Sequence, residues 1–212
     1  MRKVEKGIEP ESLTSWKRAH SNSCYDDLTY VERQAIRNAC LIEQFYLCAY
    51  CCQSITGENN DCMNEHVEAR NIAPNRSLDF SNIVASCTSL RQCDATHDSR
   101  HLPLTPFMAE CATELKFKVS GRVEGLTERA KESIRVLNLG DTEQNNRSLI
   151  EKRRRLSLDL LWTNEIDPSE GIDDDELIEM LIEDIKRPKG GKLEAFSPVV
   201  ANILQGWLCI SP

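Results

Sequence analysis

The chain has 212 residues, of which 40% are hydrophobic, enough for one ordinary domain or for a small core with an appendage. No run of 18 apolar residues occurs, which excludes a membrane-spanning helix, and the charged N-terminus lacks the apolar core of a signal peptide. The net charge of −8 disfavours strong nucleic-acid binding by the chain alone, because such binding depends on lysine and arginine. We therefore expect a cytoplasmic protein with reduced cysteines.

Two helices are predicted before the first cysteine pair. Residues 1–10 read as extended, and Glu11 to His20 reads as a short helix with Leu13 and Trp16 on one face. After a polar loop, Tyr30 to Gln44 reads as a second helix. Its predicted apolar stripe consists of Val31, Ala35, Ile36 and Ala39. Phe45 to Leu47 is then expected to be a strand that enters the cysteine turn.

Four cysteines form two groups that could hold zinc. Cys48 and Cys51 lie two residues apart on a tight turn, and Cys87 and Cys93 could form the second pair. Zinc takes four thiolates in a tetrahedron, although five residues between Cys87 and Cys93 exceed the usual two to four. Cys52 and Cys62 are possible competing ligands, and buried or free thiols are the simpler alternative. The cysteines left over are Cys24, Cys40, Cys52, Cys62, Cys111 and Cys209.

Between the two cysteine groups lie side chains suited to phosphodiester hydrolysis. Glu65 is a carboxylate beside His66, whose imidazole suits a general base near neutral pH. Met63 to Val67 is predicted to be the strand carrying this pair. Neighbouring residues on a strand point to opposite faces, so Glu65 and His66 need a bend or a strand end to share a metal. Ser81 to Ser86 is expected to begin a short helix or turn capped by Ser81.

Together these residues resemble the motif of HNH nucleases with a structural zinc. That family has Cys-x-x-Cys, an acidic residue with His, and then Asn-x4-Cys-x2-Cys, whereas this chain reads Asn82-x4-Cys87-x5-Cys93-Asp94. The resemblance implies that Glu65 and Asp94 hold a catalytic Mg²⁺ or Mn²⁺ and that His66 is the base. It also implies that Asn82 ties the loop between the strands to the backbone. His97 falls where the family often has Lys, so it is an additional ligand, a phosphate contact or a solvated helix residue.

Further segments resemble one particular HNH family, the PtuB endonuclease subunits of Septu anti-phage systems, which also occur as retron effectors. The similar segments are Met1 to Lys6, Cys48 to Cys51, Leu102 to Pro106 and Ile134 to Leu139, with a weaker echo at Leu193 to Ile203. The resemblance implies a PtuA-like ABC-type ATPase as partner. It also implies, for retron versions, a reverse transcriptase with its RNA–DNA product.

The C-terminal half is predicted to be mainly helical. We expect a strand at Leu115 to Val119, then helices at Thr127 to Leu139, Asn145 to Trp162, Asp173 to Ile185 and Pro198 to Trp207. In the second helix the expected buried residues are Leu149, Leu156, Leu160 and Leu161. Lys152, Arg153, Arg154 and Arg155 form the densest basic run, either a phosphate or partner contact or a solvated helix face. Arg70 and Arg76 could also contact phosphate. Residues 163–212 hold 11 acidic and 4 basic side chains, so most of the net charge lies there.

The expected fold is α+β, mostly α, with a small zinc-stapled ββα-metal module of the HNH type. Its expected parts are a helical segment at 1–47, the nuclease module at 48–106 and a helical, partner-docking region at 107–212. The favoured function is a nuclease acting on DNA, or alternatively on RNA such as tRNA. The competing hypothesis is a non-catalytic, zinc-stapled adaptor that docks the ATPase.

Overall fold

The structure is a computed structural model and describes residues 1–169, 172 and 174–208. Within these residues it has seven α-helices and two small antiparallel sheets, which confirms the α+β class. In chain order the elements are α1 (Glu11–Ala19), η1 (Tyr25–Asp27), α2 (Tyr30–Glu43), β1 (Cys62–His66), η2 (Pro74–Arg76), η3 (Phe80–Asn82), β2 (Ile83–Cys87), α3 (Asp94–His97), η4 (Ala109–Ala112), β3 (Leu115–Phe117), β4 (Val123–Gly125), α4 (Glu128–Leu137), α5 (Glu143–Thr163), α6 (Asp175–Lys186) and α7 (Ser197–Leu208).

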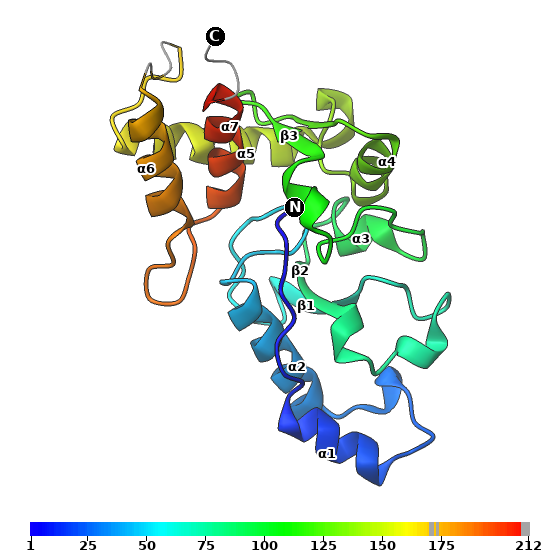
Figure 1. Ribbon diagram of the computed structural model, residues 1–212. Coiled ribbons are helices and arrows are strands. Elements are labelled where there is room, and N and C mark those ends of the chain that lie inside the picture. The colour runs from blue at the N-terminus through cyan, green and yellow to red at the C-terminus, as the bar shows by residue number, and fades with distance from the viewer. Residues whose placement is uncertain (170–171, 173, 209–212) are drawn as a thin grey trace.

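The strands β1 and β2 lie near the middle of an elongated molecule (Figure 1). The helices α1 and α2 form one end, and α5, α6 and α7 form the other. The N-terminal segment runs alongside the central sheet before α1 begins. Val4 donates its backbone N–H to the carbonyl of Pro106, and Lys6 forms an ion pair with Glu43 of α2. This extended segment therefore links α2 to the chain around Pro106.

Helix α2 packs against β2. Thr29 begins the helix with a capping box, because its hydroxyl accepts from Val31 N–H and Glu32 bonds back to the Thr29 N–H. The predicted stripe is wrong in detail, since Val31 is exposed and the buried apolar residues are Ile36, Cys40 and Leu41. Cys40 and Leu41 extend the face of Ile36 by one helical turn, and cysteine serves there as a small apolar residue.

The segment after α2 is a turn and not the predicted strand. Phe45 and Tyr46 have positive φ angles of 53° and 61°, which reverse the chain at the helix end. Only Leu47 reaches an extended pairing, with Ser54 across the cysteine turn. The predicted strand failed here because three consecutive apolar residues fit a buried turn as well as a strand.

The central sheet carries the residues between the two cysteine pairs. β1 and β2 run antiparallel with Cys62 opposite Cys87 and His66 opposite Ile83. The helix or turn expected at Ser81 to Ser86 is present only at its start, in η3, and is wrong from Ile83 onward, where the residues form β2, buried along its whole length. The β-branched pair Ile83 and Val84 favours a strand. The residue that caps the preceding 3₁₀ helix η3 is Asp79, whose carboxylate accepts from the Ser81 N–H, and not the expected Ser81.

The C-terminal half follows the prediction more closely. Thr127 caps α4 by accepting from Ala130 N–H, and Ala130, Ile134 and Leu137 are buried as expected. The expected strand shortens to β3, which pairs with β4. In α5, Leu149 and Leu161 are buried, but Leu156 and Leu160 are only half-buried. The other side chains that α5 buries include those of Ile150, Arg153 and Ser157, which were not expected in the core.

The main core draws on all three predicted segments, since its buried residues include Leu13, Ile83 and Phe196. A second, smaller core lies among α5, α6 and α7 and contains Leu161, Ile178 and Leu204. No helix in the described ranges is long and apolar enough to cross a membrane. Two expectations, the start of a helix at Asp173 and the reduced state of Cys209, fall outside the described residues.

Candidate metal centre and adjoining cleft

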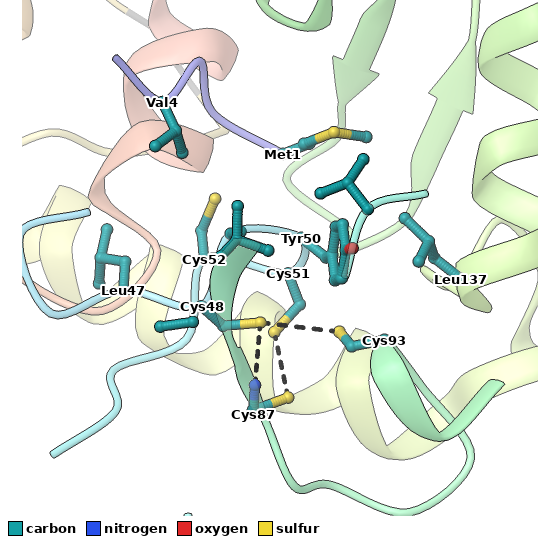
Figure 2. Packing of buried hydrophobic residues seen from close by; sticks show 14 of the residues in the cluster. Met1, Val4, Leu47, Cys48, Tyr50, Cys51, Cys52, Cys87, Cys93 and Leu137 are labelled. Atoms are coloured by element: carbon teal, nitrogen blue, oxygen red, sulfur yellow. Dashed lines mark hydrogen bonds between the residues drawn. The ribbon is translucent and has the colours of Figure 1, made fainter. Parts of the chain in front are cut away.

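The four predicted zinc ligands converge on one point in the buried centre of the chain. Cys48 and Cys51 come from the turn after α2, Cys87 ends β2, and Cys93 immediately precedes α3. Their sulfur atoms all lie within 4.8 Å of one another. Figure 2 shows the four sulfurs facing each other, with Tyr50 beside them. The predicted convergence of these thiols is therefore confirmed.

The spacing of the sulfurs fits a tetrahedral metal. A zinc ion with four Zn–S bonds of ~2.3 Å places its sulfurs ~3.8 Å apart. Cys48 Sγ lies 3.9 Å from Cys93 Sγ, and Cys51 Sγ lies 3.9 Å from Cys87 Sγ. These separations are far longer than a disulfide bond of ~2.05 Å. Burial raises the pKa of Cys51 and Cys93 well above the usual range, whereas hydrogen bonds from the neighbouring thiols lower the pKa of Cys87 and Cys48. A divalent cation would therefore be needed to hold all four as thiolates.

The long second loop closes with the help of distant residues. Arg91 and Cys93 adopt positive φ angles, and the Cys93 N–H donates to Leu137 O at the end of α4 (2.9 Å). Gln92 fills the space inside the loop and points its amide nitrogen at the sulfurs of Cys51 and Cys87, each at 3.7 Å. The five-residue spacing is thus accommodated by one inward-facing glutamine.

The competing cysteines stay outside the group. Cys52 and Cys62 are both buried, but neither belongs to the four-sulfur cluster. Burial raises the pKa of Cys62 to about 12, which keeps it a neutral thiol. The nine cysteines in the described ranges are free, consistent with the expected reduced state.

A second constellation of polar side chains lies beside the thiol group. Glu65 on β1 is 7% exposed, and its Oε1 lies 2.5 Å from Nδ1 of the fully buried His97. The Tyr50 hydroxyl also donates to this oxygen, at 3.3 Å. His97 is therefore not the solvated helix residue that was one expectation. It holds the carboxylate of Glu65 from the side of α3.

Asp94 completes this constellation, because its carboxyl group shares a hydrogen bond with Glu65. Burial and the adjoining carboxylate raise the pKa of Asp94 to about 8, and burial also raises that of Glu65. Two carboxyl groups this close share a proton unless a cation replaces it. Oxygen ligands of this kind suit Mg²⁺ or Mn²⁺. Within the described residues, only the four cysteines form a group of three or more ligands that is mutually within 4.8 Å.

His66 lines the same cleft as Glu65 and Asp94, a hollow of about 830 Å³. It is the last residue of β1, so the strand ends where Glu65 and His66 would otherwise point to opposite faces. Its Nε2 lies 2.8 Å from Ser77 O, and its ring meets the edge of Tyr25 at 4.7 Å. Burial lowers the pKa of His66, which keeps the imidazole neutral near pH 7.

Asn82 fixes the loop between β1 and β2. Its Oδ1 accepts from Glu68 N–H at 2.8 Å and its Nδ2 donates to Glu68 O at 2.9 Å. Asn82 is 1% exposed. The side chain therefore holds the chain immediately after His66 in place.

The predicted basic contacts behave differently from one another. Arg70 lines the cleft and pairs with Asp26, whereas Arg76 is held by Glu68 and Asp79. In the basic run, Lys152, Arg154 and Arg155 are exposed. Arg153 is wrong as a surface residue, because it is fully buried and donates to Gly121 O (2.8 Å) and Leu139 O (3.1 Å).

Several residues of this centre were not predicted. Tyr50 was not predicted to belong to the site, although it lies between the ligands Cys48 and Cys51. Gln92 was not predicted either, although it immediately precedes Cys93. Both could have been found by asking which polar neighbours of the ligands must be buried with them. Asp26 in η1 and Ser77 at the end of η2 carry no comparable signal, since neither adjoins a predicted ligand in the sequence.

No family model and no curated protein matches this sequence. The assignment of the site therefore depends on its own geometry and chemistry.

Proposed function

We propose that this protein is a metal-dependent nuclease subunit of the HNH type, which hydrolyses phosphodiester bonds in nucleic acid. One observation carries the proposal: a neutral imidazole and two carboxyl groups, those of His66, Glu65 and Asp94, line one open cleft beside a four-thiol group. These are the groups required to activate water and to hold a hard cation. The order of these residues along the chain also resembles that of the HNH motif, which carries out the same chemistry.

In this proposal the chain's own residues divide the work. His66 takes the proton of the attacking water. Its Nε2 at the Ser77 carbonyl is the protonated nitrogen, which leaves the other ring nitrogen to accept that proton. Glu65 and Asp94 would hold the cation, and the cation when bound would stabilise charge on the phosphate and the leaving oxygen. His97 and Tyr50 fix the Glu65 carboxylate, and Asn82 fixes the loop that follows the base.

The four cysteines would hold a structural zinc. The metal would fasten the turn after α2, the end of β2 and the start of α3 to each other. Of these elements, α3 lines the cleft with Asp94, and β2 pairs with β1, which carries Glu65 and His66. A structural zinc site of this kind contributes directly to folding. Its loss should therefore disturb the cleft even though none of the four cysteines lines it.

The proposed biological setting is anti-phage defence, in which the chain works with an ABC-type ATPase and, in a retron version, with a reverse transcriptase and its RNA–DNA product. The net charge of −8 supports a partner that supplies a basic surface. The cleft itself is lined by Asp26, Asp94 and Asp98 as well as by Arg70, so it attracts phosphate poorly without a cation. DNA is the favoured substrate, and RNA is the alternative.

The test replaces His66 by alanine in the complex assembled with the ATPase. We expect cleavage of DNA or RNA to fall by at least about a hundredfold, because general-base catalysis contributes ~10²–10⁴ in rate. His101→Ala is the matched control, since His101 is exposed and outside the cleft. Both variants should keep the zinc content of the parent chain. Undiminished cleavage by the His66 variant would refute the proposal.

The alternative is a zinc-stapled adaptor that docks the ATPase without cutting. The exposed Leu177 and Met180 on the acidic outer face of α6 favour such a docking role. An adaptor would contain tightly bound zinc and need no added Mg²⁺ or Mn²⁺. Metal analysis after mild chelation, followed by assays with and without Mg²⁺, separates the two functions.

A further inference from the structure

Tyr50 occupies an unusual position between the two metal sites. It lies within the Cys48–Cys51 turn, so both of its flanks are tied to the thiol group. Its side chain is 0% exposed, and its hydroxyl reaches Glu65 Oε1 at 3.3 Å. Ala49, which precedes it, donates its N–H to Ala85 O on β2 at 3.1 Å, which fixes the turn against the sheet. A phenol in this place bridges the turn and the catalytic strand.

The contacts of Glu65 with Tyr50 and His97 both fall on one of its two oxygens. Oε1 receives Tyr50 from the cysteine turn and His97 from α3. A carboxylate has a second oxygen with its own lone pairs, and that oxygen is left for a cation or for Asp94. A ligand held in one orientation binds a metal more tightly, because less rotamer freedom is lost on binding.

We propose that Tyr50 is a positioning residue that couples the thiol group to the cleft, by holding Glu65 in the orientation that binds the hard cation. This inference rests on the proposed nuclease function. It goes beyond that function because it makes the placement of a catalytic carboxylate depend on the cysteine turn. Occupancy of the four-thiol group by zinc then sets the affinity of the second site. The coupling is reciprocal, because linkage between two binding sites works in both directions, so a cation held by Glu65 also favours zinc in the four-thiol group.

The test removes the hydroxyl alone, with Tyr50→Phe. The matched control is Tyr46→Phe, which removes the hydroxyl of a half-buried tyrosine in the same turn region. Each zinc-loaded protein is titrated with Mn²⁺, and bound Mn²⁺ is followed by electron paramagnetic resonance. We expect the dissociation constant for Mn²⁺ to rise about fivefold in the Tyr50 variant, which is the net contribution of ~1 kcal/mol of a typical hydrogen bond. We expect no change in the control.

Zinc content and thermal unfolding of both variants are measured alongside. A Tyr50 variant that keeps its zinc and its unfolding midpoint but binds Mn²⁺ more weakly supports the inference. Equal Mn²⁺ affinity in the parent and both variants overturns it, while leaving the nuclease function intact. Absence of any Mn²⁺ binding by the parent chain overturns the proposed function itself, so the two failures are distinguishable. Should Tyr50→Phe lose zinc, Glu65→Gln provides the second measurement. It leaves the cysteine turn intact and must weaken Mn²⁺ binding at least as much, and unchanged Mn²⁺ affinity in that variant overturns the inference.

Discussion

Replacing Arg153 by alanine should destabilise the fold by about 2–4 kcal/mol. The guanidinium is fully buried in α5, donates to the carbonyls of Gly121 and Leu139, and lies 5.1 Å above the ring of Phe117. Losing the donor leaves two buried carbonyls unpaired, at ~1–3 kcal/mol each, and leaves a cavity where the stem was. Relief of the cost of burying the charge offsets part of this loss. The same change at exposed Arg154, which pairs with Glu151, should cost less than about 1 kcal/mol.

The assay is urea unfolding of the zinc-loaded chain, with Arg154→Ala as the control. A third variant, Arg153→Lys, keeps the charge but cannot present two donors in a rigid fork, so it should fall between the parent and Arg153→Ala. The reasoning is refuted if Arg153→Ala and Arg154→Ala shift the midpoint equally, or if lysine restores full stability. Either result would mean that the two carbonyl contacts do not carry the stability assigned to them.

Two further predictions concern the metal sites. Cys93→Ala should reduce the zinc content from one per chain to less than about half at micromolar metal, since only three ligands remain. Cys62→Ala should leave the zinc content unchanged. Equal zinc content in both variants would contradict the ligand assignment. Without a cation the pKa of Asp94 is about 8 when folded, against ~3.9 in an unfolded chain. The folded chain then binds the extra proton, so its stability should fall as pH rises from ~4 to ~8. Urea midpoints across that range should show this decline, Mn²⁺ should restore the stability at high pH, and Asp94→Asn should flatten the profile. A parent profile that rises over the same range contradicts the sign.

The sequence predicted the parts of the fold that depend on local pattern. Thr127 and the spacing of Ala130, Ile134 and Leu137 specify α4 by a cap and a helical period, and the structure has both. The Cys-x-x-Cys spacing likewise selected Cys51 over Cys52, because two intervening residues let both sulfurs face one metal. Such signals are contained within a few residues, so no distant contact is needed to interpret them.

The misses depend on contacts that a single sequence does not contain. Arg153 belongs to a basic run in the sequence, but its guanidinium is buried because it donates to the carbonyls of Gly121 and Leu139, which lie far from it along the chain. Ser81 to Ser86 is expected to begin a helix or turn, but pairing with β1 makes Ile83 to Cys87 a strand. His97 could be solvated or buried, and its contact with Glu65, 32 residues earlier, decides that as well.

Gln92 shows how far the sulfur cluster reaches into the rest of the chain. Its amide contacts two of the thiols, and its Oε1 accepts from Asn146, the one residue inside α5 with non-helical backbone angles. Asn146 in turn donates to Asn138 O beyond the end of α4. Removing the residues after 106 would therefore remove Asn146, the hydrogen-bond partner that holds Gln92 in the cysteine loop. The cysteine module and the helices that follow should accordingly melt in one transition, and neither should survive expression as a separate fragment.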